Sequence, residues 1–329
     1  MGRIAVTDGL AKAAVAKLVE SGHEVVEEHI SADGLQGGAL TGFDAIIVRS
    51  ATKLTASAIE ATEGLKVIGR AGVGIDNIDI EAANAKDIVV VNAPLASTQS
   101  VVELTIGHLL SSTRKLAECD RGLRKGKWQK KEMVGTELSG KALGLIGFGR
   151  IAQKVAKVAE VLGMEIHAYD PYLPAKVGLK LGARMHDDID DLFRMCTHIS
   201  VHCNLSEETY HLVNEKRLSL MPNRGADGVS CGNHLVNCAR GGIVDEDAVF
   251  RALQSNILAS AALDVFEIEP VNPDHPLLKH PSFHGTPHIG AATLEAQVRV
   301  GHDIANAVDA AMRGELVETQ VNREILDRE

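Results

Sequence analysis

Aromatic residues are scarce in this chain, at 3% of its 329 residues, although hydrophobic residues make up 45%. Val, Ile, Leu and Ala must therefore fill the interior, as they do around the buried parallel strands of α/β folds. No apolar run approaches the roughly 18 residues of a membrane-spanning helix, so we expect no membrane partner. Met1 leads into a strand-like segment without the basic and apolar stretches of a secretion signal, and we expect a cytoplasmic protein.

Basic residues do not dominate either: 34 Lys and Arg stand against 44 Asp and Glu, a formal net charge of -10. A chain with a net negative charge repels the phosphate backbone of nucleic acids, so we expect no nucleic-acid partner. The five cysteines form an odd set without a CxxC pair or a histidine spaced for zinc. We therefore expect reduced thiols, as in cytosolic proteins, and no metal site.

The length of the chain suits two domains, because single hydrophobic cores stop growing at around 250–300 residues. Short β-branched runs alternate with Ala-rich amphipathic stretches, which predicts βαβ units around parallel sheets. The first half predicts a flavodoxin-like domain of five strands. These strands are expected at residues 4–7, 24–27, 45–48, 66–69 and 88–92, with helical spacing near residues 10–20, 55–61 and 78–85.

The second half predicts six parallel strands, the count of a Rossmann dinucleotide-binding sheet. They are expected at residues 142–147, 165–170, 198–202, 234–237, 258–264 and 282–285. Between the halves, residues 97–119 predict one long helix that leads into a basic loop at residues 121–131. Another amphipathic helix is expected from Thr293 to about Arg313. The predicted fold class is α/β, with two doubly wound parallel-sheet domains.

A glycine-rich turn, Gly147-Phe-Gly149-Arg-Ile-Ala152, stands between the first strand of the second half and the following helix. Backbone amides and a helix N-terminus at such a turn can hold a pyrophosphate. Asp170 ends the next strand, where a carboxylate would accept hydrogen bonds from the adenosine ribose. Because a carboxylate repels a 2′-phosphate, we expect NAD rather than NADP as the cofactor.

Three further motifs surround Arg240, Glu269 and His288, in the segments 237–246, 262–270 and 286–291. Each of these side chains comes at or just beyond the end of a predicted strand, where open parallel sheets bind ligands. Together with the glycine-rich turn, the motifs resemble the D-2-hydroxyacid dehydrogenases in composition and in order. The resemblance covers essentially the whole chain.

The resemblance implies a role for each of the three side chains. Arg240 would bind the carboxylate and 2-oxo group of the substrate, Glu269 would pair with His288, and His288 would be the general acid/base. The chemistry agrees, because hydride transfer to a ketone needs an imidazolium to deliver a proton and a guanidinium to clamp the acid. A carboxylate beside the imidazole would orient it and stabilise its charged form.

The resemblance also implies the domain boundaries and the cofactor contacts. In the family the C-terminal helix returns to the first domain, so residues 1–97 and 292–329 would form the substrate-binding domain and residues 98–291 the NAD-binding domain. The residues expected near the cofactor are Gly147, Gly149, Arg150, Ile151, Asp170, Cys203, Cys238, Asp264 and Ala291. Asp264 in particular would lie near the nicotinamide carboxamide.

The substrate end of the first domain is closely similar to the phosphoglycerate dehydrogenases within this family. The expected substrate contacts are Arg49, Ser50, Arg70, Val73, Gly74 and, from a neighbouring subunit, Lys130. Arg49, Lys53 and Arg70 supply cations that a phosphorylated three-carbon acid needs and that lactate or glyoxylate does not. We therefore expect NAD-dependent oxidation of 3-phospho-D-glycerate, the first step of serine biosynthesis, with solvated surface cations as the alternative reading of these residues.

Two other functions stay open at this point. A reductase for glyoxylate, hydroxypyruvate or another small 2-oxo acid would use identical machinery with a different substrate rim. An NAD-sensing corepressor would keep the same three residues but act by binding peptides. The family pairs through the long helix at residues 97–119, so we expect a homodimer or homotetramer.

Two departures from the family pattern concern length. Residues 222–234 are about eight residues longer than in relatives and predict an extended loop, which is either inert or alters access to the nicotinamide pocket. The chain ends at residue 329, whereas many phosphoglycerate dehydrogenases add regulatory domains. We expect no serine feedback through such a domain.

Overall fold

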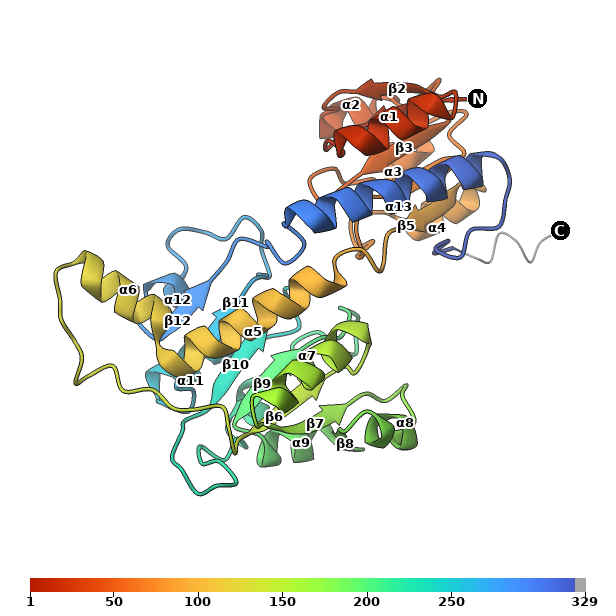
Figure 1. The fold of residues 1–329 in the computed structure, drawn as a ribbon. Coiled ribbons are helices and arrows are strands. Elements are labelled where there is room, and N and C mark those ends of the chain that lie inside the picture. The colour runs from red at the N-terminus through yellow and green to blue at the C-terminus, as the bar shows by residue number, and fades with distance from the viewer. Residues whose placement is uncertain (323–329) are drawn as a thin grey trace. The chain divides into compact units, whose positions relative to one another are not determined.

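The computed structural model describes residues 1–322 and divides into two compact units (Figure 1). Unit 1 comprises Met1–Thr98 and the segment from Ala291 onward, and unit 2 comprises Gln99–Gly290. These bounds differ by one residue from those expected for the substrate-binding and NAD-binding domains. The last part of the expected substrate-binding domain, residues 323–329, lies outside the described residues. Within residues 1–322, no helix is both long and apolar enough to cross a membrane.

Unit 1 is built on a five-stranded sheet whose neighbouring strands are all parallel. Its order is β2 (Glu24–Glu27), β1 (Arg3–Val6), β3 (Ala45–Val48), β4 (Val67–Arg70) and β5 (Val89–Asn92). This 2-1-3-4-5 order is that of the flavodoxin-like fold. The order reverses beside β1, so ligands are expected at the carboxyl ends of these strands.

Helices cover both faces of the unit 1 sheet. The helices α1 (Lys12–Glu20) and α13 (Leu294–Met312) pack on one face, and α2 (Ala32–Gln36), α3 (Ala56–Glu60) and α4 (Ile80–Ala85) pack on the other. Four of these helices begin at a side-chain cap, because Ser31, Thr55, Asp79 and Thr293 each accept a backbone N–H of the first turn. The predicted C-terminal helix is confirmed by α13, which returns to the N-terminal sheet.

Unit 2 contains a seven-stranded parallel sheet. Its order is β12 (Phe283–Gly285), β11 (Ser260–Leu263), β10 (His234–Asn237), β9 (His198–Val201), β6 (Ala142–Ile146), β7 (Glu165–Tyr169) and β8 (Arg184–Met185). From β8 to β11 this is the Rossmann order, with β12 added at the far edge. The predicted class of two doubly wound parallel sheets is confirmed.

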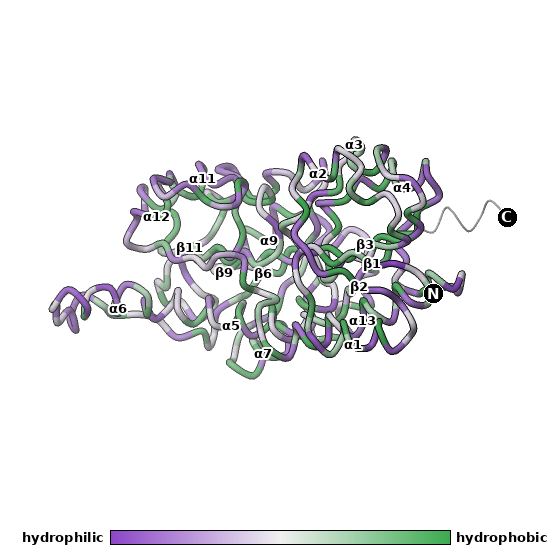
Figure 2. The backbone as a smooth tube through the Cα atoms, turned by 90° about the horizontal axis from the view of Figure 1, so that it is seen from above, coloured by the Kyte–Doolittle hydropathy of each residue, from purple (hydrophilic) through white to green (hydrophobic). Residues whose placement is uncertain are grey.

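Two apolar cores enclose the unit 2 sheet because its buried strands carry hydrophobic side chains on both faces. One core packs α5 (Thr98–Arg114) and α7 (Arg150–Val161) against the sheet, and the other packs α9 (Ile189–Met195), α10 (Glu215–Leu218) and α11 (Glu246–Gln254). In Figure 2 the strand β6 has the green of hydrophobic residues, and α11 includes purple, hydrophilic residues. The remaining helices are α6 (Leu116–Arg124), α8 (Ala175–Lys180) and α12 (Pro276–Lys279).

Two predictions for unit 2 were wrong. The expected single helix at residues 97–119 is two helices, α5 and α6, because Lys115 adopts a left-handed φ of 53° that interrupts the hydrogen-bond ladder. The first residues of the expected basic loop at 121–131 belong to α6. The sheet also has seven strands rather than six. The missed strand, β8, is only two residues long, which is too short for a periodic hydrophobic signal.

The long loop at residues 222–233 precedes β10 and therefore lies at the amino edge of the parallel sheet. Asp227 from this loop pairs with the buried Lys141, which directly precedes β6, at 2.6 Å. The nicotinamide site of such a sheet lies at the opposite, carboxyl edge. The loop thus does not border the predicted site, which argues against a role in access to it.

Buried histidines in unit 2 are expected to make the protein acid-labile. His167, His198 and His234 are at most 4% exposed, and the rings of His198 and His234 stack at 4.6 Å. Burial lowers the pKa of His167 and of His234 to about 4, and lowers the pKa of His198 well below its usual range. Their charged forms are therefore disfavoured in the folded protein.

The stability prediction follows from proton binding. The unfolded chain protonates these histidines below about pH 6.5, whereas the folded chain resists protonation down to about pH 4. Stability is therefore fully present above pH 6.5 and is lost as the pH falls through this window. We expect His167 and His234 together to lower the free energy of unfolding by about 3 kcal/mol from pH 6.5 to pH 5, and His198 to act in the same direction. Urea titrations at these two pH values measure this, and an unchanged free energy would contradict the account.

Candidate active site

The three predicted catalytic side chains follow three neighbouring strands of unit 2. Arg240 comes after β10, Glu269 after β11 and His288 after β12, and these strands are adjacent and parallel. Because the carboxyl ends of parallel strands share one edge of the sheet, the chain delivers all three side chains to the same edge. Asp264, which directly follows β11, stands at this edge as well.

The imidazole of His288 and the carboxylate of Glu269 are in direct contact. His288 Nδ1 donates to Glu269 Oε2 at 2.7 Å, and the two side chains are 44% and 36% exposed. A carboxylate only accepts hydrogen bonds, so Nδ1 carries the hydrogen and Nε2 is the ring atom available for proton exchange. This is the geometry of a general acid/base that is oriented by a carboxylate and open to a substrate.

Arg240 is close enough to Glu269 for its charge to act on the same carboxylate. Burial opposes ionisation of the Glu269 carboxyl. Hydrogen bonds from His288 and from the Phe266 N–H, together with the charges of His288 and Arg240, outweigh burial and hold the pKa of Glu269 below its usual range. The structure thus brings together a guanidinium, a carboxylate and an imidazole.

The turn that carries Arg240 is fixed by the chain around it. The buried side chain of Asn237 accepts from the Ala239 N–H and donates to the Arg240 carbonyl, each at 2.9 Å. The next residue, Gly241, packs so closely on the Phe266 backbone that an added Cβ would come within 1.8 Å of the Phe266 carbonyl oxygen. Only glycine fits there, and the contact couples the Arg240 turn to the segment that leads to Glu269.

Asp264 holds the loop that presents His288. Its side chain is 1% exposed, and it accepts hydrogen bonds from Thr286 Oγ1 at 2.6 Å and from the Ile289 and Gly290 N–H groups at 2.8 Å. The Asp264 carbonyl accepts from the His288 N–H at 2.7 Å. These bonds stabilise His288 at a φ of 52°, a left-handed conformation that costs energy for a residue other than glycine. The expected contact of Asp264 with the nicotinamide stays a prediction.

Sequence reasoning missed two residues that support this loop. Thr286 Oγ1, which bonds Asp264, also contacts Nε2 of the buried His108 at 3.1 Å. His108 belongs to α5, far from the loop in sequence, and it carries no motif signal of its own. Burial lowers the pKa of His108, so it serves this network as a neutral ring.

The glycine-rich turn has the form that a pyrophosphate needs. Gly147 has a φ of 82°, and an added Cβ would come within 2.9 Å of the Cys203 N atom. Gly149 precedes the first residue of α7, and an added Cβ there would meet no atom within 4 Å, so the backbone at the helix N-terminus is open to a ligand. Arg150 and Ile151 form the first turn of this helix.

Asp170 lies beside the turn at the end of β7, as predicted. Its carboxylate accepts from the Phe148 N–H at 2.9 Å and from the Tyr172 N–H at 3.0 Å. The Tyr172 hydroxyl bonds Glu208 Oε2 at 3.1 Å, which adds a second carboxylate to this part of the surface. The residues present therefore fit a dinucleotide whose ribose hydroxyls are recognised by acidic groups.

The two cysteines expected near the cofactor are protonated thiols. Burial raises the pKa of Cys203 to about 11 and that of Cys238 to about 12. A thiol in this state is a poor nucleophile, which argues against covalent catalysis by either residue, and their expected contacts with the cofactor stay predictions. All five cysteines are free. Among residues 1–322, no group of three or more potential ligand side chains could hold a metal ion.

Arg49 and Arg70 lie at the ends of neighbouring strands in unit 1. Val48, which precedes Arg49, is the register partner of Arg70 across β3 and β4. The turn after β3 is held by Asp8, whose carboxylate accepts from the Arg49 N–H at 2.7 Å and from the Thr52 N–H at 3.0 Å. Sequence reasoning missed Asp8. The residues that carry the two guanidinium groups therefore lie at the same edge of the unit 1 sheet, an arrangement that suits an anionic ligand.

The remaining substrate candidates of unit 1 occupy loops at the same edge. Ser50 follows Arg49 and is exposed, and Val73 and Gly74 follow Arg70. Asn92, the last residue of β5, donates from its side chain to the Val73 carbonyl at 2.7 Å and so fixes this turn. The last cofactor candidate, Ala291, is exposed and is the first residue of the segment that returns to unit 1.

The structure does not bring Lys130 to the catalytic residues of its own chain. Lys130 is exposed in the segment that links α6 to β6. Arg121 anchors α6 on the carbonyl of Pro281, which precedes β12, whereas His288 follows this strand. The segment thus begins near the amino edge of the sheet and ends at the start of β6, which lies on the same edge. Its expected role, in a neighbouring subunit, stays a prediction.

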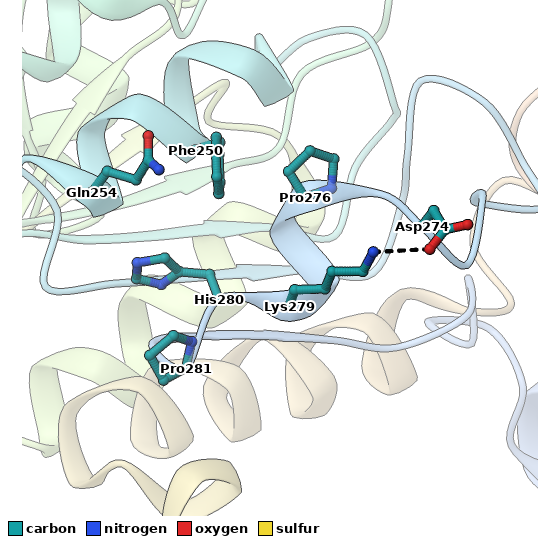
Figure 3. Close-up of a pocket in the computed structure, with 7 residues that line it drawn as sticks. All are labelled: Phe250, Gln254, Asp274, Pro276, Lys279, His280 and Pro281. Atoms are coloured by element: carbon teal, nitrogen blue, oxygen red, sulfur yellow. Dashed lines mark hydrogen bonds and ion pairs between the residues drawn. The ribbon is translucent and has the colours of Figure 1, made fainter.

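A cavity of about 360 Å³ lies away from the catalytic residues of unit 2. Figure 3 shows the side chains that line it, which are Phe250, Gln254, Asp274, Pro276, Lys279, His280 and Pro281. His280 and Pro281 precede β12, at the edge opposite to His288, and Lys279 pairs with Asp274 at 2.8 Å. The cavity therefore does not belong to the candidate site.

The fold and the site define a nicotinamide-dependent dehydrogenase with two α/β domains. The model of the D-isomer specific 2-hydroxyacid dehydrogenase NAD binding domain matches residues 106–290. The chain is 44% identical to the hydroxypyruvate reductase of Thermotoga maritima over 309 residues, covering 93% of this chain and 97% of that protein. The chain belongs to the D-isomer specific 2-hydroxyacid dehydrogenase family, and NAD is its cofactor.

Two further relatives are phosphoglycerate dehydrogenases. That of Methanocaldococcus jannaschii is 44% identical over 322 residues, which cover 98% of this chain and 60% of that protein. The chain thus spans little more than half of this relative. The NAD+-bound 3-phosphoglycerate dehydrogenase of Entamoeba histolytica has a TM-score of 0.79 and 30% identity, and the match covers 98% of each chain. These relatives are enzymes, which argues against the corepressor alternative.

Proposed function

We propose that the protein oxidises 3-phospho-D-glycerate reversibly to 3-phosphohydroxypyruvate with NAD, the first step of serine biosynthesis. The observation that carries this proposal is the placement of Arg49 and Arg70 on neighbouring strand ends of unit 1. An acid with a phosphate and a carboxylate needs more cations than Arg240 alone provides. The names of the relatives from Methanocaldococcus jannaschii and Entamoeba histolytica support the same substrate.

Each catalytic side chain has a defined task in this reaction. Arg240 clamps the substrate carboxylate and the oxygen on C2 through charge-assisted hydrogen bonds. His288 Nε2 accepts the proton of the C2 hydroxyl, and the carboxylate of Glu269 at Nδ1 stabilises the imidazolium that forms. NAD, when bound, supplies the acceptor for the hydride that leaves C2. In the reverse direction the imidazolium of His288 returns the proton to the oxygen.

A second candidate is reduction of unphosphorylated hydroxypyruvate or glyoxylate. It is favoured by the Thermotoga maritima hydroxypyruvate reductase, because the chain covers 97% of that protein at 44% identity. The two candidates use the same catalytic residues and differ only in the rim that binds the far end of the substrate. The phosphate itself therefore discriminates between them.

Initial rates on phosphohydroxypyruvate and on hydroxypyruvate test the proposal. We expect kcat/KM to be at least about 100-fold higher for the phosphorylated acid, since two charge-assisted contacts at about 1.5–3 kcal/mol each supply this preference. Replacing Arg49 and Arg70 by Gln should remove the preference and spare the rate on hydroxypyruvate. Running both substrates with NADH and NADPH checks the expected selectivity of Asp170. Equal rates on the two acids would favour the reductase.

We also propose that the protein is a homodimer or a homotetramer. Several large apolar side chains around α6 and the segment that follows it are exposed in unit 2: Leu116, Leu123, Trp128 and Val134 are each more than half exposed. An apolar patch of this kind on a single chain marks a protein contact. Lys130 belongs to the same segment, so a second copy that covers this segment would also lie against Lys130. A particle mass of one chain at micromolar concentration would contradict this proposal.

A further inference from the structure

Glu246, the first residue of α11, is a buried carboxylate next to the segment that carries Glu269. The residue is 7% exposed. Its Oε1 accepts from the Glu267 N–H at 2.7 Å, and its Oε2 pairs with His275 Nε2 at 3.1 Å. The backbone two residues before Glu269 is therefore tied to the N-terminus of a helix on one side and, through His275, to the segment that precedes α12 on the other.

The tie between the two segments is reciprocal. Glu267 Oε1 accepts from the Glu246 N–H at 3.3 Å and from His211 Nε2 at 2.9 Å. One residue further back, the Phe266 N–H donates to Glu269 Oε1 at 3.0 Å, while Glu269 Oε2 receives the His288 ring. The backbone that Glu246 holds is thus the backbone that orients the catalytic carboxylate.

Packing alone gives no reason for a charged group at this position. Taking a carboxylate out of water is costly, and an apolar residue of similar size would often stabilise the fold more. Burial raises the pKa of Glu246, partly offset by the Glu267 N–H and the charge of His275, while the nearby charges of Glu267 and Asp247 oppose ionisation further. The contacts of the Glu246 carboxylate with the Glu267 N–H and His275, rather than its packing, therefore point to a positional use.

The surroundings show what the tie prevents. A hollow of about 340 Å³ lies beside the segment, lined in part by Glu246, Glu267 and His275 and by Ile268 and Pro270, which flank Glu269. A loop next to empty space can shift into it when its anchor is removed. The Glu269 carboxylate would then move away from His288 Nδ1 and lose their hydrogen bond. Misplacement of a catalytic group by about 1 Å can cost on the order of 100-fold in rate.

We propose that Glu246, supported by His275, is a positioning residue that holds residues 266–269 so that the Glu269 carboxylate meets His288 Nδ1. The inference rests on the proposed roles of Glu269 and His288 but not on which D-2-hydroxy acid is the substrate. Under this proposal, Glu246 affects kcat only by positioning the Glu269 carboxylate. It predicts no effect on the affinity for NAD, because the glycine-rich turn and Asp170 lie on other strands.

The test is a double-mutant cycle in the full-length enzyme on its best substrate. Glu246→Gln should lower kcat about 10-fold and Glu246→Ala about 100-fold, with the KM for NAD unchanged. In a Glu269→Gln background the same substitutions should lower kcat no further, because the group they position is already gone. His275→Ala should act in the same direction as Glu246→Gln. Thermal melting establishes that each variant is folded.

The matched control is Glu215→Gln. Glu215 is likewise the first residue of a helix, α10, but its carboxylate is exposed and pairs with Arg251. We expect it to leave kcat unchanged. If Glu246→Gln lowers kcat equally in the wild-type and Glu269→Gln backgrounds, or leaves kcat unchanged while Glu269→Gln is impaired, the positioning role of Glu246 is overturned. Full activity of Glu269→Gln would instead refute the acid/base assignment, and the inference would fall with it.

Discussion

Replacing His288 by Ala is expected to lower kcat by about 100- to 10,000-fold, the usual contribution of a general acid/base. The imidazole supplies the atom that exchanges the proton with the substrate oxygen, and Ala leaves no group in its place. The affinity for NAD, measured by calorimetry, should change little, because the glycine-rich turn and Asp170 are separate from the His288 loop. Stability should also change little, since the His288 side chain is 44% exposed.

His29→Ala is the matched control for this substitution, because His29 is exposed in unit 1 and lies outside the candidate site. It should leave both kcat and the affinity for NAD at the wild-type values. Turnover of the His288 variant within a factor of about three of the wild type would show that another group exchanges the proton. The roles of Glu269 and of Glu246 would then need a different explanation.

Replacing Arg240 by Ala is expected to lower kcat/KM by about 100- to 10,000-fold, because it removes two charge-assisted hydrogen bonds at about 1.5–3 kcal/mol each. The loss should appear in both the KM for the acid and in kcat, since the clamp binds the substrate and also aligns C2 for hydride transfer. Steady-state kinetics with the acid varied at saturating NAD measure both constants.

Arg240→Lys separates charge from shape. Lysine keeps the charge but not the planar fork, so we expect it to recover only part of the lost kcat/KM. The charge of Arg240 also contributes to holding the pKa of Glu269 below its usual range. Replacing Arg240 by Ala should therefore raise the pKa of the Glu269 carboxyl, whereas Arg240→Lys should raise it less. A kcat/KM near the wild-type value in Arg240→Ala would contradict the proposed clamp.

The fold was largely predictable because its signals are periodic and local. Buried parallel strands read as β-branched runs, and the predicted strand at residues 234–237 coincides with β10. The break between α5 and α6 was not predictable, since the left-handed residue there is Lys115 and carries no glycine or proline signal. A strand as short as β8 leaves no period to detect.

The candidate site shows a similar division. Arg240, Glu269 and His288 were predicted because their motifs resemble those of the D-2-hydroxyacid dehydrogenases and because each comes at or just beyond the end of a predicted strand. The ties that hold them were not found, because they join residues distant in sequence: Asp264 to the loop of residues 286–290, His108 to Thr286, and Glu246 to Glu267. Backbone N–H groups make several of these bonds. Because every residue except proline carries such a group, the sequence gives no signal that marks the ones involved.

The most direct test of the account is deuterium transfer from 3-phospho-D-glycerate labelled at C2. Incubated with NAD, the wild-type enzyme should yield reduced cofactor that carries one deuterium, and the His288→Ala variant should yield almost none in the same time. The account would be contradicted if the wild type released the label to water, formed unlabelled reduced cofactor, or left the labelled acid unchanged.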